Sequence, residues 1–403
     1  MRIAEINSVD YGSTGKIMLQ IADCARNDGF EVRTFSKKWR KQTKPNKYHD
    51  FFGYTFENAV NVVLTKFFGF QGLFSYFGTK QLVKKLKAYR PDLIHLHNLH
   101  DYCVCLPVLF NYIKKNNIPV VWTLHDCWAF TGQCPYFDMS GCNRWLSGCG
   151  RCPQLTAKLP VDCSSFMWKK KYKCFTGVRE MTLVTPSHWL AELVKHSFLK
   201  EYPVQVINNG IDLSVFKPTP SNFRDCYGIE PGKNILLGVA FGWGKRKGLD
   251  VFVELSRRLN PEKYQIVLVG TDDAIDKILP DGVISIHRTQ NQTELAEIYT
   301  AADLFVNPTR EENYPTVNME SIACGTPVVT FCTGGSPEIL NESTGIVVDS
   351  EDLDAMVKEI RHICEETPFS EASCLERSRS FNTNERFQEY VSIFRKLNNA
   401  CRV

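Results

Sequence analysis

The chain has 403 residues, too many for a single compact core, and its hydrophobic share of 43% is that of an ordinary globular protein, so we expect two domains. It begins like a strand rather than a secretory signal, and its apolar runs are too short to span a membrane, which favours a cytoplasmic protein. The net charge of +4 is uneven, because residues 1–200 hold 28 Lys and Arg against 14 Asp and Glu (+14) and the remainder holds 20 against 30 (−10). A basic half can face anionic lipid, a diphosphate or nucleic acid, or it can be a solvated surface.

Short runs rich in Val and Ile alternate with helical patterns along the chain, which is typical of parallel strands buried on both faces. The predicted strands are Ile3–Asn7, Val32–Phe35, Leu93–Leu96, Val120–Leu124, Thr182–Thr185, Val204–Ile207, Ile235–Val239, Gln265–Val269, Val283–Ile286, Leu304–Asn307, Val328–Thr330 and Ile346–Val348. The predicted helices include Ile17–Asn27, Lys80–Ala88, Leu249–Arg258, Leu295–Thr300 and Leu353–Cys364. This alternation predicts doubly wound α/β structure.

The domain boundary is predicted near residues 200–220, where turn-forming sequence precedes the extended connector Lys217–Pro220. We therefore assign residues 1–203 to a first Rossmann-like domain and residues 204–384 to a second. We expect the carboxyl ends of the two parallel sheets to face each other across a cleft, where such sheets bind ligands.

The segment Gly12-Ser13-Thr14-Gly15-Lys16 follows the first predicted strand. It is superficially like the phosphate-binding loop of ATPases, but Asp10 stands where that motif needs a glycine, so we reject an ATPase. A plain strand-to-helix turn with Ser13 or Thr14 as the capping residue is one interpretation.

A basic stretch, Lys37-Lys38-Trp39-Arg40-Lys41, is followed by an aromatic-rich helical pattern from Phe51 to Phe77. Basic residues beside Phe and Trp suit docking on a membrane surface. The same aromatic side chains can equally belong to the core.

Two predicted strands of the first domain lead into histidines: His97-Asn98 follows Leu93–Leu96, and His125-Asp126 follows the next strand. A side chain at the carboxyl end of such a strand points toward the ligand edge of the sheet, which makes His125 the main candidate. His97 and Asn98 are equally well explained by packing. We expect Asp126 either to orient His125 or to bind a hydroxyl of a substrate.

Four cysteines, Cys134, Cys142, Cys149 and Cys152, fall within 19 residues. Four thiols ending in a C-x-x-C pair can hold a tetrahedral structural zinc, with Cys127 as an alternative ligand. Reduced packing cysteines and a disulfide pair are the other interpretations.

In the second domain, the residues around Pro315 predict a loop followed by one helix that ends before Gly325. The free N–H groups at the start of a helix can bind phosphate. Glu312 in the loop and Glu320 in the helix can accept hydrogen bonds from sugar and ribose hydroxyls, or can be a capping carboxylate and a solvated one.

The loop Gly242-Trp243-Gly244-Lys245-Arg246-Lys247-Gly248 follows the strand Ile235–Val239. Cations beside glycines in this position suit a diphosphate, although an exposed basic turn is the alternative. A second loop, Arg288-Thr289-Gln290-Asn291, follows Val283–Ile286 and can be an ordinary turn.

The flanks of the two glutamates resemble the donor site of family 4 glycosyltransferases, whose motif has two glutamates separated by seven residues. The segments that carry the resemblance are Ala301–Pro308, Glu312–Glu320, Ala323–Val329 and Gly334–Glu338. The run from Trp122 to Gln154 resembles a subgroup of capsular and exopolysaccharide (colanic-acid-type) enzymes. The resemblance implies two Rossmann-like domains in the glycosyltransferase B-type architecture, with a C-terminal helix (385–403) that packs back on the first.

The resemblance also implies roles for individual residues. Glu312 and His125 would contact the donor sugar, and Glu320 would contact the ribose. Backbone N–H groups near Tyr314, Thr316 and Val317 would meet sugar and phosphate oxygens. The remaining donor contacts would be Gly15 near the phosphate, Lys247 of the Lys-Gly pair, Arg246 in place of an arginine that the family has where this chain has Gly242, and Thr289 in the loop that holds the base.

The implied activity is a retaining glycosyltransferase that uses a nucleotide diphosphate sugar without a catalytic metal. The implied acceptor is a saccharide or a polyprenyl-diphosphate-linked saccharide in surface polysaccharide synthesis (capsule or lipopolysaccharide), at the inner face of the cell membrane. Nucleic acid is not expected as a partner. The alternatives are a sugar-nucleotide epimerase or hydrolase on the same fold and, from another class, a zinc-bearing basic module that binds nucleic acid. A phosphorylase would need a pyridoxal-binding lysine, for which the sequence gives no support.

Overall fold

The computed structural model describes residues 1–39, 45–100, 102–155 and 161–400. The chain divides into two compact units, Met1–Asn208 with Asn384–Val403, and Asn209–Thr383. The boundary expected after residue 203 thus falls after Asn208. Within the described residues, no helix combines the length and the apolarity that crossing a bilayer requires.

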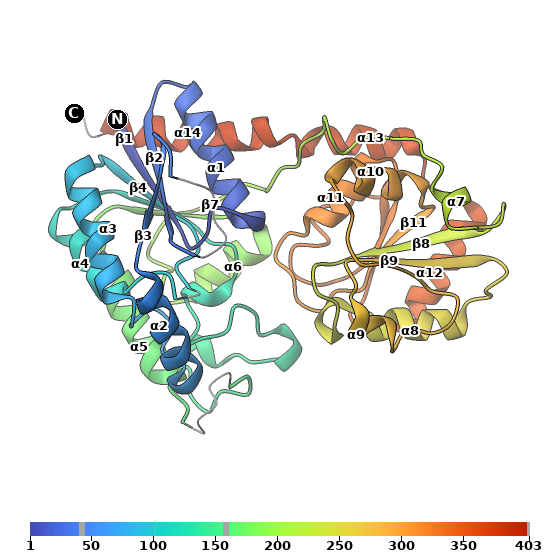
Figure 1. Ribbon diagram of the computed structural model, residues 1–403, viewed down its shortest axis with the longest axis horizontal. Coiled ribbons are helices and arrows are strands. Elements are labelled where there is room, and N and C mark those ends of the chain that lie inside the picture. Colours follow the sequence, from blue (N-terminus) through green and yellow to red (C-terminus); the bar gives the residue numbers. More distant parts are fainter. Residues whose placement is uncertain (40–44, 101, 156–160, 401–403) are drawn as a thin grey trace. The chain divides into compact units, whose positions relative to one another are not determined.

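The first unit contains a seven-stranded, all-parallel sheet in the order β3-β2-β1-β4-β5-β6-β7 (Figure 1). Its strands are β1 (Arg2–Asn7), β2 (Glu31–Lys37), β3 (His49–Phe52), β4 (Leu93–Leu96), β5 (Val120–Thr123), β6 (Met181–Thr185) and β7 (Val204–Val206). Assigning β7 to the second domain was wrong, because it pairs with β6. The edge strand β3 was not predicted, since it has only four residues and two of them are polar.

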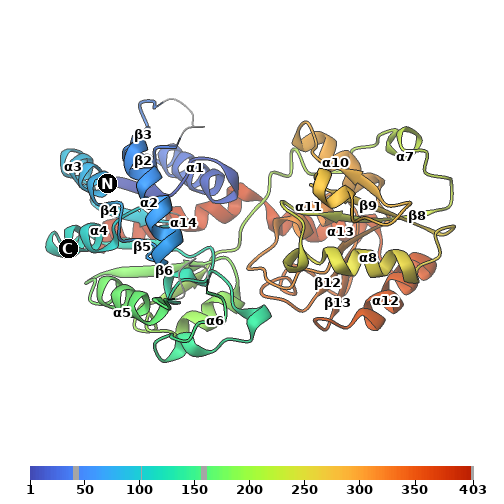
Figure 2. The same ribbon diagram turned by 60° about the horizontal axis from the view of Figure 1, so that its bottom comes forward.

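Helices cover both faces of this sheet (Figures 1 and 2). They are α1 (Gly12–Asn27), α2 (Thr55–Phe68), α3 (Tyr76–Tyr89), α4 (Leu106–Lys115), α5 (Ser164–Phe175), α6 (His188–His196) and α14 (Thr383–Ala400). Side chains alternate along each strand, so Ile3 joins a core with α1 and α14, whereas Ala4 and Ile6 join a core with α3 and α4. The helical pattern expected from Phe51 to Phe77 is instead the end of β3, then α2, a connecting segment and the start of α3.

The second unit contains a six-stranded parallel sheet in the order β10-β9-β8-β11-β12-β13. Its strands are β8 (Asn234–Val239), β9 (Tyr264–Val269), β10 (Ile284–Ile286), β11 (Leu304–Asn307), β12 (Val328–Phe331) and β13 (Gly345–Val348). Its helices are α7 (Phe223–Cys226), α8 (Leu249–Arg258), α9 (Asp273–Asp276), α10 (Gln292–Ala301), α11 (Thr316–Ala323), α12 (Leu353–Glu366) and α13 (Glu371–Ser378). One face packs on α8 and α12, and the other on α10 and α11.

The strand order locates the ligand edge of each sheet. The order reverses between β1 and β4 in the first unit and between β8 and β11 in the second. In open α/β sheets, ligands bind at the carboxyl ends of the strands on either side of such a reversal. The fold is therefore two doubly wound α/β units, as predicted, and the ligand edges are formed by the segments that follow these four strands.

Candidate functional site

In the second unit, the segments that follow β8 and β11 are bound to each other. The carbonyl of Arg246 accepts a hydrogen bond from Arg310 N at 2.9 Å, and Arg246 Nη1 donates to the carbonyl of Glu311 at 3.2 Å. Gly248 has a φ of +76°, and a Cβ there would lie 2.5 Å from the carbonyl oxygen of Pro308. The Lys-Gly pair thus needs its glycine for the two segments to meet.

This approach brings together two of the predicted site residues. Lys247 Nζ lies 2.5 Å from Glu312 Oε2, and each side chain is 18% exposed. The other carboxylate oxygen of Glu312 accepts a hydrogen bond from Asn313 N at 3.0 Å. The predicted ligands for diphosphate and for sugar therefore form a charge-assisted pair at the β8–β11 reversal.

A third segment holds the backbone of Glu312. Gly334 has a φ of +56°, and a Cβ there would lie 1.8 Å from the carbonyl oxygen of Glu312. Gly335 N donates to the carbonyl of Asn313 at 2.8 Å. The glycine pair after β12, known from the sequence only as part of the family motif, supports the loop that carries Glu312.

Helix α11 carries the second glutamate. It begins at Thr316, with Pro315 as its capping residue, and its eight residues end before Gly325, as predicted. The N–H groups of Thr316 and Val317 lie in its first turn, where helix geometry provides no intrahelical acceptor. Tyr314 is buried in the core, so only its backbone is suited to the role expected of it.

The hydroxyl of Tyr299 donates a hydrogen bond to Glu320 Oε2 at 3.2 Å. Burial raises the pKa of Tyr299 well above its usual range, so this hydroxyl keeps its proton and remains a donor. Tyr299 lies in α10 and gave no signal in the sequence beyond an apolar helix position. It orients the carboxylate of the partly exposed Glu320.

Arg310 is a further residue that the sequence did not indicate. Its guanidinium is 6% exposed and donates to both carboxylate oxygens of Asp250, at 2.6 and 2.9 Å, and to Glu351 Oε2 at 2.9 Å. The hydrogen bonds to Glu351, followed by those to Asp250, raise the pKa of Arg310 above its usual range. Arg310 thus anchors the segment before Glu312 and is occupied by protein carboxylates.

Of the two other predicted donor residues, one joins these contacts and one lies apart from them. Arg246 is next to Lys247, is exposed and bonds to the segment before Glu312, whereas Thr289 follows β10, two strands away from β8. In the described part of the chain, no hydrogen bond or ion pair joins Thr289 to the Lys247–Glu312 pair. The one Asp-x-Asp pattern of this unit serves structure, because Asp352 caps α12 and Asp354 pairs with Arg258 at 2.5 Å.

In the first unit, a buried carboxylate lies beneath the histidines at the β1–β4 reversal. Glu5 of β1 is in register with His95 of β4. Its oxygens lie 3.2 Å from His95 Nδ1 and 3.1 Å from His97 Nε2. His97 Nδ1 lies in turn 3.2 Å from His125 Nε2, and the two rings are stacked. Three strands thus contribute to one polar row that ends at His125.

The protonation of this row follows from its electrostatics. Burial alone would raise the pKa of Glu5, but His95 and His97 lower it to about 2. Burial, with His95, lowers the pKa of His97 to about 4, and burial, with His97, lowers that of His125 to about 3. At neutral pH, ionised Glu5 therefore accepts from Nε2–H of neutral His97. His97 Nδ1 is then an acceptor, so His125 must carry its proton on Nε2.

Asp126 and His97 both act on His125. Asp126 accepts hydrogen bonds from His100 Nε2 at 3.0 Å and from Trp128 N at 2.8 Å, and its charge opposes the lowering of the pKa of His125 by burial. His97 is hydrogen-bonded to His125. His95 Nε2 lies 2.8 Å from Thr123 Oγ1, which lies 3.3 Å from the hydroxyl of Tyr390 in α14.

Gly15 lies in the first turn of α1 rather than in a loop. A Cβ at this position would lie 2.6 Å from the carbonyl carbon of Asp10, so glycine is needed for the helix to pack on the segment that follows β1. The helix is capped by Tyr11 without a side-chain hydrogen bond, which contradicts the expectation for Ser13 or Thr14.

The four clustered cysteines, Cys134, Cys142, Cys149 and Cys152, line one small cavity beside Trp145. All described cysteines are free thiols. Among the described residues, two groups of three candidate ligands have their ligating atoms within 4.8 Å of one another, Glu5/His95/His97 and Asp273/Asp276/His287, and neither contains a cysteine. The four thiols are therefore close but not gathered at that spacing, and zinc stays a prediction.

Two residues of the expected basic stretch, Arg40 and Lys41, lie outside the described part of the chain. Lys37 is buried and donates to Ser75 Oγ at 2.6 Å. Burial lowers the pKa of Lys37 to about 8. Lys37 is thus a structural residue, whereas Lys38 beside it is exposed.

Family models match both units of the chain. Residues 14–215 match the family model described as Glycosyltransferase Family 4, and residues 233–366 match the one described as Glycosyl transferases group 1. Over 328 residues the chain is 27% identical to WcaC of Escherichia coli K12, which carries the name of a colanic acid biosynthesis glycosyl transferase; the match covers 76% of this chain and 77% of WcaC.

Two solved structures share the fold. Sucrose-phosphate synthase from Thermosynechococcus elongatus matches with a TM-score of 0.72 at 18% identity, over 99% of both chains. HepE from Anabaena in complex with UDP matches with a TM-score of 0.66 at 16% identity, over 98% of this chain and 100% of HepE. These structures show the fold, and the family model that matches half of the sequence shows the family: the chain belongs to glycosyltransferase family 4.

Proposed function

We propose that the protein is a retaining glycosyltransferase that moves a sugar from a nucleotide diphosphate sugar to a saccharide or lipid-linked saccharide of a surface polysaccharide. The observation that carries the proposal is the Lys247–Glu312 pair at the β8–β11 reversal, beside the amino end of α11. The similarity to WcaC supports an acceptor from polysaccharide synthesis. The complexes of HepE with UDP and with UDP-glucose support a nucleotide diphosphate sugar as the donor.

On the donor side, the bound diphosphate would draw the ammonium of Lys247 away from Glu312. The N–H groups of Thr316 and Val317 would add the partial positive charge of a helix start. Glu312 would then have a carboxylate oxygen available for a hydroxyl of the sugar, and Glu320, oriented by Tyr299, would take a hydroxyl of the ribose. One ion pair would thus be exchanged for two ligand contacts.

In the transfer step, the bond between the anomeric carbon and the diphosphate oxygen breaks, and the acceptor oxygen bonds to that carbon from the same face. The acceptor proton passes to the departing phosphate oxygen. Lys247, Arg246 and the start of α11 would balance the charge on that leaving group without a catalytic metal. We propose His125, with its proton held on Nε2, as the contact of the first unit to the transferred sugar.

The test is a panel of UDP-, GDP- and ADP-sugars, with diphosphate release and thermal shift as readouts, each with and without saccharide acceptors. We expect one donor class to stabilise the protein and to turn over faster with an acceptor. Proton coupling constants of the product give its anomeric configuration, which must equal that of the donor. Donor consumption that no acceptor accelerates would favour the epimerase or hydrolase instead, and no response to any donor would refute the proposal.

A further inference from the structure

Helix α2 exposes its apolar side and buries its polar side, which is the reverse of the usual arrangement in a surface helix. Its outer stripe is Phe56, Val60, Val63 and Phe67, at the spacing i, i+4, i+7 and i+11, and Phe56 and Val63 are 81% and 52% exposed. Its buried residues are all polar: Glu57, Asn58, Asn61 and Thr65. A surface helix of a globular protein normally buries the apolar stripe and exposes the polar one.

Specific hydrogen bonds fix this orientation. The carboxylate of Glu57 accepts from Phe77 N and Gly78 N, both at 2.8 Å, and so caps the start of α3. Asn58 Nδ2 donates to the carbonyl of Lys38 at 2.6 Å, and Asn61 Nδ2 donates to Ser75 Oγ at 2.9 Å. Rolling the helix to bury its apolar stripe would leave all of these groups without partners in the interior. The exposed stripe is therefore built into the fold.

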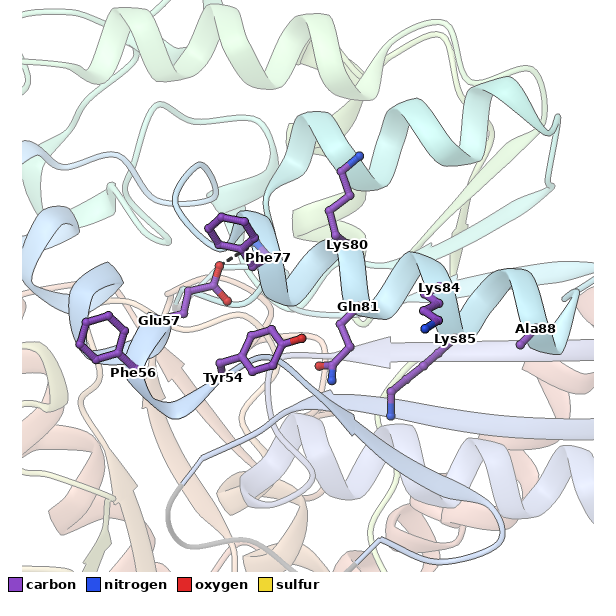
Figure 3. Close-up of a pocket in the computed structure, with 9 residues that line it drawn as sticks. All are labelled: Tyr54, Phe56, Glu57, Phe77, Lys80, Gln81, Lys84, Lys85 and Ala88. Atoms are coloured by element: carbon purple, nitrogen blue, oxygen red, sulfur yellow. Dashed lines mark hydrogen bonds between the residues drawn. The ribbon is translucent and has the colours of Figure 1, made fainter.

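A groove of about 840 Å³ joins the start of this stripe to α3. Figure 3 shows Tyr54, Phe56 and Phe77 around Glu57 at one end, and Lys80, Lys84 and Lys85 along α3. Over residues 54–90 the chain has six cations, Lys66, Lys80, Lys84, Lys85, Lys87 and Arg90, against one acidic residue. That residue is Glu57, which is already bonded to the start of α3. Lys85 is paired with Asp50 of β3 at 2.6 Å, so the positive charge beside the apolar stripe comes mainly from Lys80 and Lys84.

We propose that the outer stripe of α2 and the lysines of α3 dock on an anionic lipid bilayer, with α2 lying in the plane of the interface. An exposed stripe of Phe and Val beside Lys is the pattern of a helix that inserts its apolar face at the level of the headgroups. The lysines match the negative charge of such a surface. A second copy of this chain would bring like charges together along the same groove. The proposal goes beyond glycosyl transfer and does not rest on the donor or its chemistry.

The experiment is flotation of the full chain with vesicles of phosphatidylcholine alone, or with about a third of phosphatidylglycerol. We expect binding to the anionic vesicles that falls at least about tenfold on neutral ones and weakens with added salt. The double variant Phe56→Ser/Val63→Ser should lose binding on both, and Lys80→Glu/Lys84→Glu should lose the preference for anionic lipid. These side chains are exposed, so circular dichroism and the melting temperature should not change.

A matched control replaces an exposed pair in the second unit, Lys277→Glu/Ile278→Ser, and should bind vesicles like the unchanged protein. Equal binding to neutral and anionic vesicles, or full binding by both α2 and α3 variants, would overturn the proposal. The proposal would also be overturned if the unchanged protein bound no vesicles and light scattering showed that it is a dimer which the α2 variant converts into a monomer. Donor turnover, measured without vesicles, should be the same in all variants, which separates this test from that of the enzymatic activity.

Discussion

The ammonium of Lys247 and the carboxylate of Glu312 lie 2.5 Å apart although 65 residues separate them in the chain. Lys247 was expected to bind the diphosphate of the donor and Glu312 its sugar. In the structure, the two side chains pair with each other. The pair keeps a cation and an anion at the ligand edge of the second unit without burying either charge alone. A donor that carries both a diphosphate and a hydroxyl can separate them, whereas an anion alone replaces only half of the contact.

Removing the cation should impair catalysis more than folding. We expect Lys247→Ala to lower kcat/KM by about 100-fold, because the leaving diphosphate loses a charged donor. Glu312→Gln should lower it to a similar degree through the lost sugar contact. Steady-state turnover with the identified donor measures both, and the exposed Lys358→Ala and Glu342→Gln serve as controls. Full activity in either site variant would contradict the role given to that residue.

Because Gly334 packs against the backbone of Glu312, adding one methyl group at Gly334 should weaken donor binding. Gly334→Ala should displace the Glu312 backbone, since the added Cβ would lie 1.8 Å from its carbonyl oxygen, and donor binding should weaken by about tenfold or more. Gly232→Ala is the matched control, because Gly232 also has a positive φ but open space around its Cα. Both variants carry the backbone strain, about 1 kcal/mol, and only Gly334→Ala carries the clash. Isothermal titration with the intact donor, in the absence of an acceptor, distinguishes them.

Acid should destabilise the first unit through His97. Its pKa in the folded protein is lowered to about 4, whereas an unfolded chain binds this proton near pH 6.5. The stability present above about pH 6.5 is therefore lost as the pH falls toward 4, by up to about 1.4 kcal/mol per pH unit. His125, with its lowered pKa, acts in the same direction. Urea denaturation between about pH 7.5 and about pH 5 measures the slope.

The His97→Gln variant removes that titration, so its free energy of unfolding should depend less steeply on pH than that of the unchanged protein. Exposed His362→Gln should keep the original slope. Identical slopes in all three proteins would show that the buried row does not govern the pH dependence.

The cysteine cluster can be tested by measuring the zinc content of the purified protein. If the sequence-based zinc prediction holds, purified protein contains about one zinc per chain, and removing it with a chelator lowers the melting temperature and frees four thiols. Cys149→Ser should abolish binding, and the exposed Cys226→Ser should not. Protein without zinc would contradict the zinc prediction and leave reduced packing cysteines or a disulfide pair; burial raises the pKa of the Cys149 thiol to about 12.

Much of this site was visible in the sequence, because Lys247, Glu312 and Glu320 belong to local patterns next to recognisable strands. Their support was not visible. Tyr299 acts from a neighbouring helix and Arg310 from a loop, and only the packed sheet brings them to their partners. The same holds for Glu5, which lies inside a predicted strand and meets His95 and His97 only in the folded sheet. Strand β7 shows how far the fold could be predicted: its sequence predicts a strand, but not which of the two sheets the strand joins.

The last helix gives the chain a particular order of assembly. Phe387, Tyr390, Val391 and Phe394 of α14 complete the core layer that contains Ile3 and Val121. During synthesis the ribosome therefore releases every strand of the first unit, and then the whole of the second, before the helix that closes the first is available. Until then the nascent chain must keep one side of its earliest sheet open, or shielded by a chaperone, while the later unit is free to fold.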